Sequence, residues 1–204
     1  LASQLLQKGE HELVPVMRSP NIEHARERLQ SIFLEKSEKI QEVVLCDLEK
    51  NFPEFKFAKK PDCVIHSAGA VRFKDSEARN LNMTRNILKL AKRLDVPLYH
   101  VSTAFVWKSS SEALPRNDYE KDKLESEKLV VKSRIPWCIV RPSIITGNSR
   151  TGAISNFTGY YLVLKAFVSA IRNSNGKVIR FPRFIGESNL IPVDLAAQKI
   201  ISLI

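Results

Sequence analysis

The chain of 204 residues carries 32 Lys and Arg against 22 Asp and Glu, a formal net charge of +10, and 44% of its residues are hydrophobic. This composition excludes a disordered or fibrous protein, and the length allows one domain with a buried core plus a small lobe. No uncharged apolar run approaches the roughly 18 residues that a membrane-spanning helix needs, so no membrane span is expected.

The positive charge suits an acidic ligand or an acidic carrier protein. Nucleic-acid binding is disfavoured, because the basic residues are spread along the chain without a zinc-finger or RNA-binding signature. Cys46, Cys63 and Cys138 stand singly inside apolar segments. They predict buried thiols in a reducing compartment, hence a cytoplasmic protein with neither a disulfide framework nor a metal site.

Short apolar runs alternate with stretches of helical spacing from the start of the chain. The expected strands span 13–17, 43–46, 63–66, 98–101 and 137–140, and the expected helices span 21–40, 76–94 and 118–133. Strands that are apolar at consecutive positions are typical of sheets buried on both faces. The pattern therefore predicts an α/β, doubly wound parallel sheet. Pro15 inside the first strand indicates a bulge or an early end.

The alternation fades after residue 150. We expect a helix over 154–174 and irregular structure with short strands over 176–194. This predicts a domain over 1–150 and a small substrate-facing lobe over 151–204. The aromatic residues of this lobe are expected to belong to its hydrophobic core and not to line a substrate pocket. They are Phe157, Tyr160, Tyr161 and Phe167.

Small and polar residues follow the predicted strands, at the edge where open parallel sheets bind ligands. They are Arg18 and Ser19, Asp47 and Leu48, Ser67 to Ala70, Ser102 to Ala104, and Arg141 to Ser143.

Tyr119 and Lys123 are four residues apart on a predicted helix, which places a phenol and an ammonium on one face. A nearby cation lowers the pKa of a phenol, and such a phenol can exchange a proton with a carbonyl oxygen. Thr103, at a strand end, can donate a second hydrogen bond to the same oxygen. The alternative interpretation is a surface pair on a solvated helix.

Together these segments resemble the extended short-chain dehydrogenase/reductase superfamily, a Rossmann-like fold. The resemblance rests on residues 64–70, 84–91, 100–104, the Tyr119/Lys123 pair and 141–143. Within the superfamily the chain is most similar to the thioester-reductase branch, which includes fatty acyl-CoA reductases and terminal reductase domains of peptide synthetases. Residues 17–18, 25–29, 102–104 and 147–152 carry that similarity.

The resemblance implies a catalytic set of Thr103, Tyr119 and Lys123. Tyr119 would protonate the nascent oxyanion, Lys123 would lower the pKa of Tyr119 and hold the ribose, and Thr103 would bind the substrate oxygen. Arg18 follows the strand where the ribose 2′ position is read, and its cation favours NADP(H) over NAD(H). The other implied cofactor residues are Asp47, Leu48, Ser67, Ala68, Gly69, Asn80, Val101, Pro142 and Ser143.

The chain departs from the superfamily pattern in several places. The family's first strand and glycine loop are expected ahead of Leu1, with residues 2–9 forming the helix after that loop. Met83 stands where the family usually has Gly, and Asp122 where it often has Ser. The family's asparagine falls on Asn80 or on Asn82.

Three functions remain open. The first is an NADP(H)-dependent reductase of a small-molecule or carrier-bound acyl thioester, with a homodimer left open. The second is an NAD-dependent sugar-nucleotide epimerase or dehydratase, or a hydroxysteroid-type dehydrogenase. The third is a cofactor-binding scaffold without catalysis.

Overall fold

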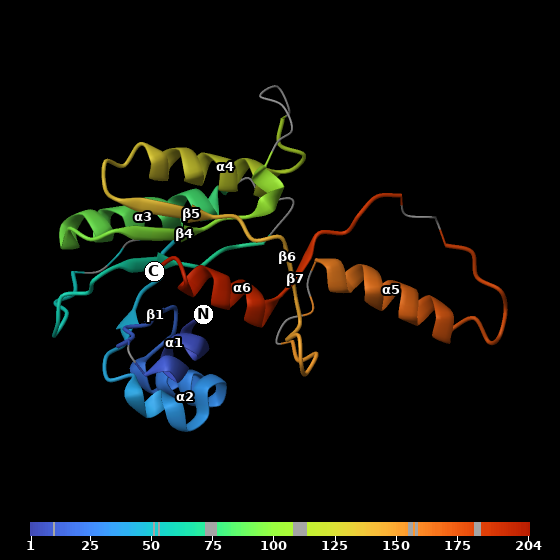
Figure 1. The fold of residues 1–204 in the computed structure, drawn as a ribbon, viewed down its shortest axis with the longest axis horizontal. Helices are drawn as coiled ribbons and strands as arrows, with labels where there is room; N and C mark the ends of the chain where they lie inside the picture. Colours follow the sequence, from blue (N-terminus) through green and yellow to red (C-terminus); the bar gives the residue numbers. More distant parts are fainter. Residues whose placement is uncertain are drawn as a thin grey trace. The chain divides into compact units, whose positions relative to one another are not determined.

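A computed structural model (Figure 1) describes residues 1–9, 11–50, 52, 54–71, 77–107, 114–154, 157, 159–181 and 185–204. The chain divides into two compact units. The first comprises Leu1–Pro142 and Ala197–Ile204, and the second comprises Ser143–Ala196.

The first unit begins with a helix and a two-stranded parallel sheet. Its elements are α1 (Ala2–Lys8), β1 (Val16–Met17), α2 (Ile22–Phe33), the 3-10 helix η1 (Leu34–Lys39) and β2 (Val44–Leu45). Val16 of β1 pairs with Val44 of β2. A small core forms around Leu6, Ala25 and Leu29, which are all buried.

Two sequence expectations change in this region. Pro15 lies just before β1, and its carbonyl accepts a hydrogen bond from Val44 N at 2.9 Å, so its missing N–H costs no ladder bond. The single helix expected over 21–40 ends at Phe33 instead. Leu34 has a φ of 52°, a left-handed conformation that an α-helix cannot continue through.

The second sheet of this unit holds the larger core. Its parallel strands β3 (Val64–His66), β4 (Leu98–Val101) and β5 (Trp137–Val140) lie in that order. Helix α3 (Arg79–Leu94) joins β3 to β4, while η2 (Ala104–Val106) and α4 (Asp118–Val131) lie between β4 and β5. Helices α3 and α4 pack together over one face of the sheet (Figure 1). Their apolar contact with β4 consists of Ile87, Leu88, Leu90, Ala91, Leu98 and Val130.

The second unit contains β6 (Ile144–Thr146), α5 (Tyr160–Arg172) and β7 (Leu190–Pro192), with β6 and β7 paired in parallel. Helix α6 (Val193–Ile201) begins in this unit and ends in the first. Helix α5 has no buried residue among those described. The expectation that Phe157, Tyr160, Tyr161 and Phe167 form core is therefore wrong: Phe157 is exposed and the other three are half-buried.

Candidate active site

Thr103 lies just beyond the carboxyl end of β4, where the chain turns into η2. Its hydroxyl accepts a hydrogen bond from Phe105 N at 3.3 Å and so caps the short helix. The turn is also tied to the next strand, because Ala104 N donates to the carbonyl of Pro142 at 2.9 Å. Thr103 is 7% exposed, so it is held in a defined position with its hydroxyl proton available to another acceptor.

Tyr119 meets this hydroxyl from the first turn of α4. Asn117 begins the helix by accepting a hydrogen bond from Glu120 N at 2.9 Å. Tyr119 is buried, and its phenol is hydrogen-bonded to the side chain of Thr103. The structure thus brings together two side chains that are 16 positions apart in sequence.

Lys123 completes the group one helical turn after Tyr119. It is 4% exposed, and its ammonium donates a hydrogen bond to the carbonyl of Val101 at 3.1 Å. The alternative of a solvated surface pair is wrong, because Tyr119 and Lys123 are both buried against the end of β4.

The electrostatics of the pair differ from the expectation. Burial raises the pKa of Tyr119, although the hydrogen bond from Thr103 acts in the opposite direction and the nearby Asp122 and Glu120 carboxylates add to the rise. The expected lowering of this pKa by Lys123 is wrong for this structure. The phenol therefore keeps its proton at neutral pH, as a proton donor must.

Lys123 is the group whose pKa falls. Burial lowers it to about 8, while the carboxylates of Asp122 and Glu127 oppose the change. A lysine poised this close to neutrality responds to small changes around it.

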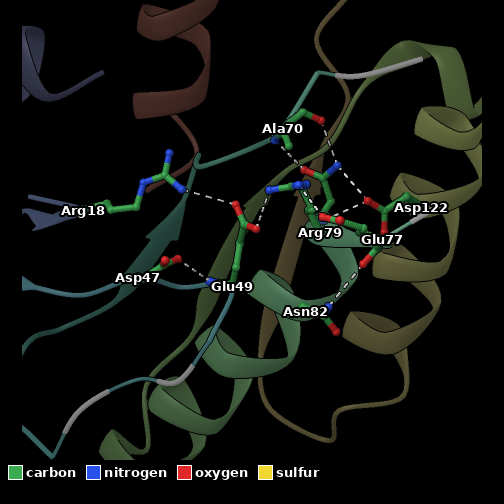
Figure 2. Close-up of polar contacts among 9 residues, drawn as sticks. Arg18, Asp47, Glu49, Ala70, Glu77, Arg79, Asn82 and Asp122 are labelled. Carbon is green, nitrogen blue, oxygen red and sulfur yellow. Dashed lines mark hydrogen bonds and ion pairs between the residues drawn. The ribbon is translucent and has the colours of Figure 1, made fainter. Parts of the chain in front are cut away.

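Asn80, at the start of α3, ties the loop after β3 to α4. Its side chain donates to the carbonyl of Ala70 at 3.0 Å and accepts from Ala70 N at 2.9 Å. Asp122, labelled in Figure 2, accepts from the backbone N–H of Asn80 at 2.8 Å, from its side-chain amide at 2.9 Å and from Leu81 N at 2.9 Å. Asn82 is half-buried and bonds to its own neighbours Glu77 and Arg85. Asn80 is therefore the asparagine that lies in the site.

Gly69 lies against both Asn80 and Lys123. A Cβ at this position would lie 3.3 Å from the Asn80 side-chain oxygen and 3.7 Å from the Lys123 ammonium. Gly69 and its neighbours Ser67 and Ala68 are exposed. The loop thus offers an accessible, small-residue surface directly beside the buried ammonium.

A second polar group lies at the carboxyl ends of β1 and β2. Figure 2 shows the Glu49 carboxylate between two guanidinium groups, 3.5 Å from Arg18 and 2.9 Å from Arg79. Asp47 accepts a hydrogen bond from Glu49 N at 3.1 Å, and Leu48 packs against the apolar core. Arg18 and Asp47 therefore both contact Glu49.

The remaining expected residues are divided between the units. Val101 and Pro142 are half-buried in the first unit, while Ser143 belongs to the second, where its hydroxyl donates to the carbonyl of Asn189.

Sequence reasoning missed a buried polar layer beneath the Tyr119/Lys123 group. His66 of β3 and His100 of β4 are register partners whose ring centroids are 5.2 Å apart. Burial lowers the pKa of His66 to about 3 and that of His100 to about 4, and the charge of Lys123 contributes to both shifts. The two histidines are therefore neutral. The available signal was a histidine at the last or next-to-last position of two consecutive strands.

Glu127 and Arg141 close this layer. Glu127 is 4% exposed, and Arg141 donates to it from Nε at 2.9 Å and from Nη2 at 2.6 Å. This two-pronged contact compensates the buried carboxylate. In the described part of the chain, no group of His, Cys, Asp and Glu could hold a metal ion. None of the described helices has the length and apolar character needed to cross a bilayer.

The comparisons with known proteins place the chain in a family. Residues 1–200 match the family model for an NAD-binding domain described as male sterility protein. The chain belongs to this family. The predicted resemblance to the thioester-reductase branch of the extended short-chain dehydrogenase/reductases is thereby confirmed. No curated protein sequence is significantly similar to the chain.

Solved structures show the same fold. The terminal R domain from the myxalamid PKS-NRPS biosynthetic pathway is 25% identical with a TM-score of 0.77, over 98% of this chain and 57% of that one. The PhqB reductase domain from Penicillium fellutanum is 20% identical with a TM-score of 0.72, over 98% and 58%. A thiolation-reductase di-domain from an archaeal non-ribosomal peptide synthetase is 17% identical with a TM-score of 0.67, over 82% and 54%. The chain thus spans between half and three fifths of the length of these structures.

Proposed function

We propose that this protein is an NADP(H)-dependent reductase that acts on an acyl thioester. The observation that carries the proposal is the hydrogen bond between Thr103 and a buried, protonated Tyr119, one turn from the ammonium of Lys123. Such a constellation suits protonation of a developing oxyanion. The family and the fold support the same reaction class.

The residues present fit a nicotinamide dinucleotide. Arg18 and Asp47 lie at the ends of β1 and β2, where the adenosine end of such a ligand is expected. Gly69 leaves room for a close approach beside Asn80 and Lys123. The Ser102 hydroxyl is buried without a hydrogen-bond partner among the described residues, so a polar group remains to be satisfied at this edge.

Each catalytic side chain has a separate task. A nicotinamide held by these residues would supply a hydride to the carbonyl carbon. Thr103 and Tyr119 bind the carbonyl oxygen, and Tyr119 gives it a proton as charge develops. The Lys123 ammonium, hydrogen-bonded to the carbonyl of Val101, stabilises the phenolate that Tyr119 becomes after it gives up its proton. It also binds the ribose hydroxyls. Before the carbonyl oxygen binds, the Thr103 hydroxyl instead donates to the phenol of Tyr119 and fixes its orientation.

The substrate assignment rests on the relatives. They include the reductase domain of the aureusimine biosynthetic cluster and a thiolation-reductase di-domain of an archaeal non-ribosomal peptide synthetase. A carrier-bound acyl group is the corresponding substrate here. The +10 net charge favours the binding of an acidic carrier protein or of a small anionic carrier. Arg18, with its side chain 70% exposed, is the proposed contact for the 2′-phosphate of NADP(H).

The test is turnover of a long-chain acyl-CoA by the full-length protein with NADPH, followed by nicotinamide absorbance. Wild-type protein should oxidise NADPH and release an aldehyde or alcohol. Tyr119→Phe should abolish this, while Tyr99→Phe, which removes a phenol from β4 outside the site, should not. Turnover of an NAD⁺-dependent alcohol substrate without any thioester reduction would favour the epimerase or dehydrogenase alternative. Binding without any turnover would favour the scaffold.

A further inference from the structure

Glu49 is held in place mainly by Arg79. Both side chains are about one quarter exposed, at 25% and 24%, and their charged atoms are 2.9 Å apart. Arg79 also contacts Glu77, and Glu49 is anchored through its own backbone, since Glu49 N donates to Asp47. The Glu49 carboxylate is thus fixed by partners other than Arg18.

Arg18 is the most exposed member of the group that it forms with Glu49, Arg79 and Glu77. Its side chain is 70% exposed and lies 3.5 Å from Glu49, a longer contact than that of Arg79. Its backbone is fixed, because Arg28 donates to the carbonyl of Arg18 at 3.0 Å. The guanidinium is therefore accessible to an incoming anion, and it lies beside the Glu49 carboxylate (Figure 2).

The charges around Arg18 nearly cancel. Among the described residues, three guanidinium groups are matched by three carboxylates, those of Arg18, Arg28 and Arg79 against those of Asp47, Glu49 and Glu77. A phosphate that binds Arg18 must share it with Glu49 and is repelled by the same carboxylate. A free 2′-hydroxyl meets no such repulsion, because it can donate a hydrogen bond to a carboxylate.

We propose that Glu49 is a selectivity residue that weakens the binding of a 2′-phosphate to Arg18. The protein then prefers NADP(H) over NAD(H) by a smaller factor than it would with Arg18 and no carboxylate at position 49. The inference rests on the proposed function, because it takes the ends of β1 and β2 as the adenosine end of the cofactor site. It assigns a role in cofactor selectivity to Glu49 and a role in positioning Glu49 to Arg79, and neither residue belongs to the motifs of the sequence analysis.

The experiment measures the binding of two probes to the full-length protein by calorimetry, at low salt. The probes are adenosine 2′,5′-bisphosphate and adenosine 5′-monophosphate, which differ only at the 2′ position. Glu49→Gln keeps the shape and an acceptor for Arg79 but removes the charge. We expect its affinity for the bisphosphate to rise about threefold or more, as an exposed charge contact predicts, with the monophosphate affinity within about twofold.

Two controls separate this local effect from others. Glu125→Gln removes the same charge from the exposed face of α4, where it pairs with Lys128, and should leave the ratio of the two affinities unchanged. In an Arg18→Gln background the gain from Glu49→Gln should be smaller, because only the direct repulsion between the Glu49 carboxylate and the phosphate remains. The gain should also shrink as salt is added.

The outcomes are distinguishable. An unchanged or lower bisphosphate preference in Glu49→Gln, with wild-type protein binding both probes, overturns the role of Glu49 alone. A gain that is equally large without Arg18 also overturns it. Failure of wild-type protein to bind either probe overturns the proposed cofactor site and this inference together.

Discussion

The carboxylate of Asp122 accepts two hydrogen bonds from Asn80, one from the backbone N–H at 2.8 Å and one from the side-chain amide at 2.9 Å. With a third bond from Leu81, it joins the start of α3 to α4. Asp122 stands where the resembling family often has Ser. This chain therefore holds its active-site loop with a charged acceptor.

We predict that Asp122→Asn loosens this junction. An amide replaces one acceptor oxygen by a donor that faces other donors, which should cost about 1–3 kcal/mol of unfolding free energy. Denaturant titration measures the loss. Asp62→Asn, at an exposed position before β3, is the matched control and should change stability by less than about 0.5 kcal/mol. Equal stability of the two variants would show that Asp122 does not hold the loop.

The neutral histidine pair predicts a loss of stability in acid. The pKa values of His66 and His100, about 3 and about 4 in the folded protein, lie below their usual value of 6.5. Between these limits the unfolded state binds more protons, so stability falls as the pH falls from 6.5 toward 4. Between pH 6.5 and 4 the loss attributable to the pair should be on the order of 5 kcal/mol.

The double variant His66→Asn/His100→Asn tests this through the slope of stability against pH, whatever its absolute stability. The slope between pH 6.5 and 4.5 should be flatter than in wild type, because this window lies between the usual and the lowered pKa values of the two histidines. If the double variant does not fold, the histidine ring signals of wild-type protein give the same answer by NMR. Two histidines that gain a proton near pH 6.5 would contradict the prediction.

Lys123 predicts how the stability of the protein depends on pH in the alkaline range. Its folded pKa of about 8 lies below the usual 10.5, so the unfolded state binds more protons between these values and stability rises with pH across that window. The rise should reach about 3 kcal/mol and disappear in Lys123→Met. NMR of protein labelled with ¹³C at lysine Cε should show one signal that titrates near pH 8 and is absent from Lys123→Arg. A titration of Lys123 above pH 10 would contradict the described burial.

Much of the fold follows from local patterns in the sequence. The apolar runs predicted β4 and β5 at 98–101 and 137–140, and the four-residue spacing placed Tyr119 and Lys123 on one helix face. Such features depend on neighbours in the chain, which a sequence displays directly.

Contacts between distant segments could not be predicted in this way. The facing of His66 and His100 depends on strand register, and the bridge from Arg18 through Glu49 to Arg79 joins three separate segments. The pKa of Tyr119 was predicted in the wrong direction for the same reason. The spacing shows that a cation is near, whereas the burial that dominates is set by tertiary packing.

The central claim is that Thr103 and Tyr119 act as one unit on the same oxygen. The most direct measurement is the kcat for acyl-CoA reduction in Thr103→Val, Tyr119→Phe and the double variant, with nucleotide affinity measured alongside. The account predicts that each single change lowers kcat about 100-fold or more, and that the double variant is little worse than Tyr119→Phe, since partners in one unit are not additive. Nucleotide affinity should stay within about twofold. Wild-type kcat in Tyr119→Phe, or effects of the two changes that multiply independently, would contradict it.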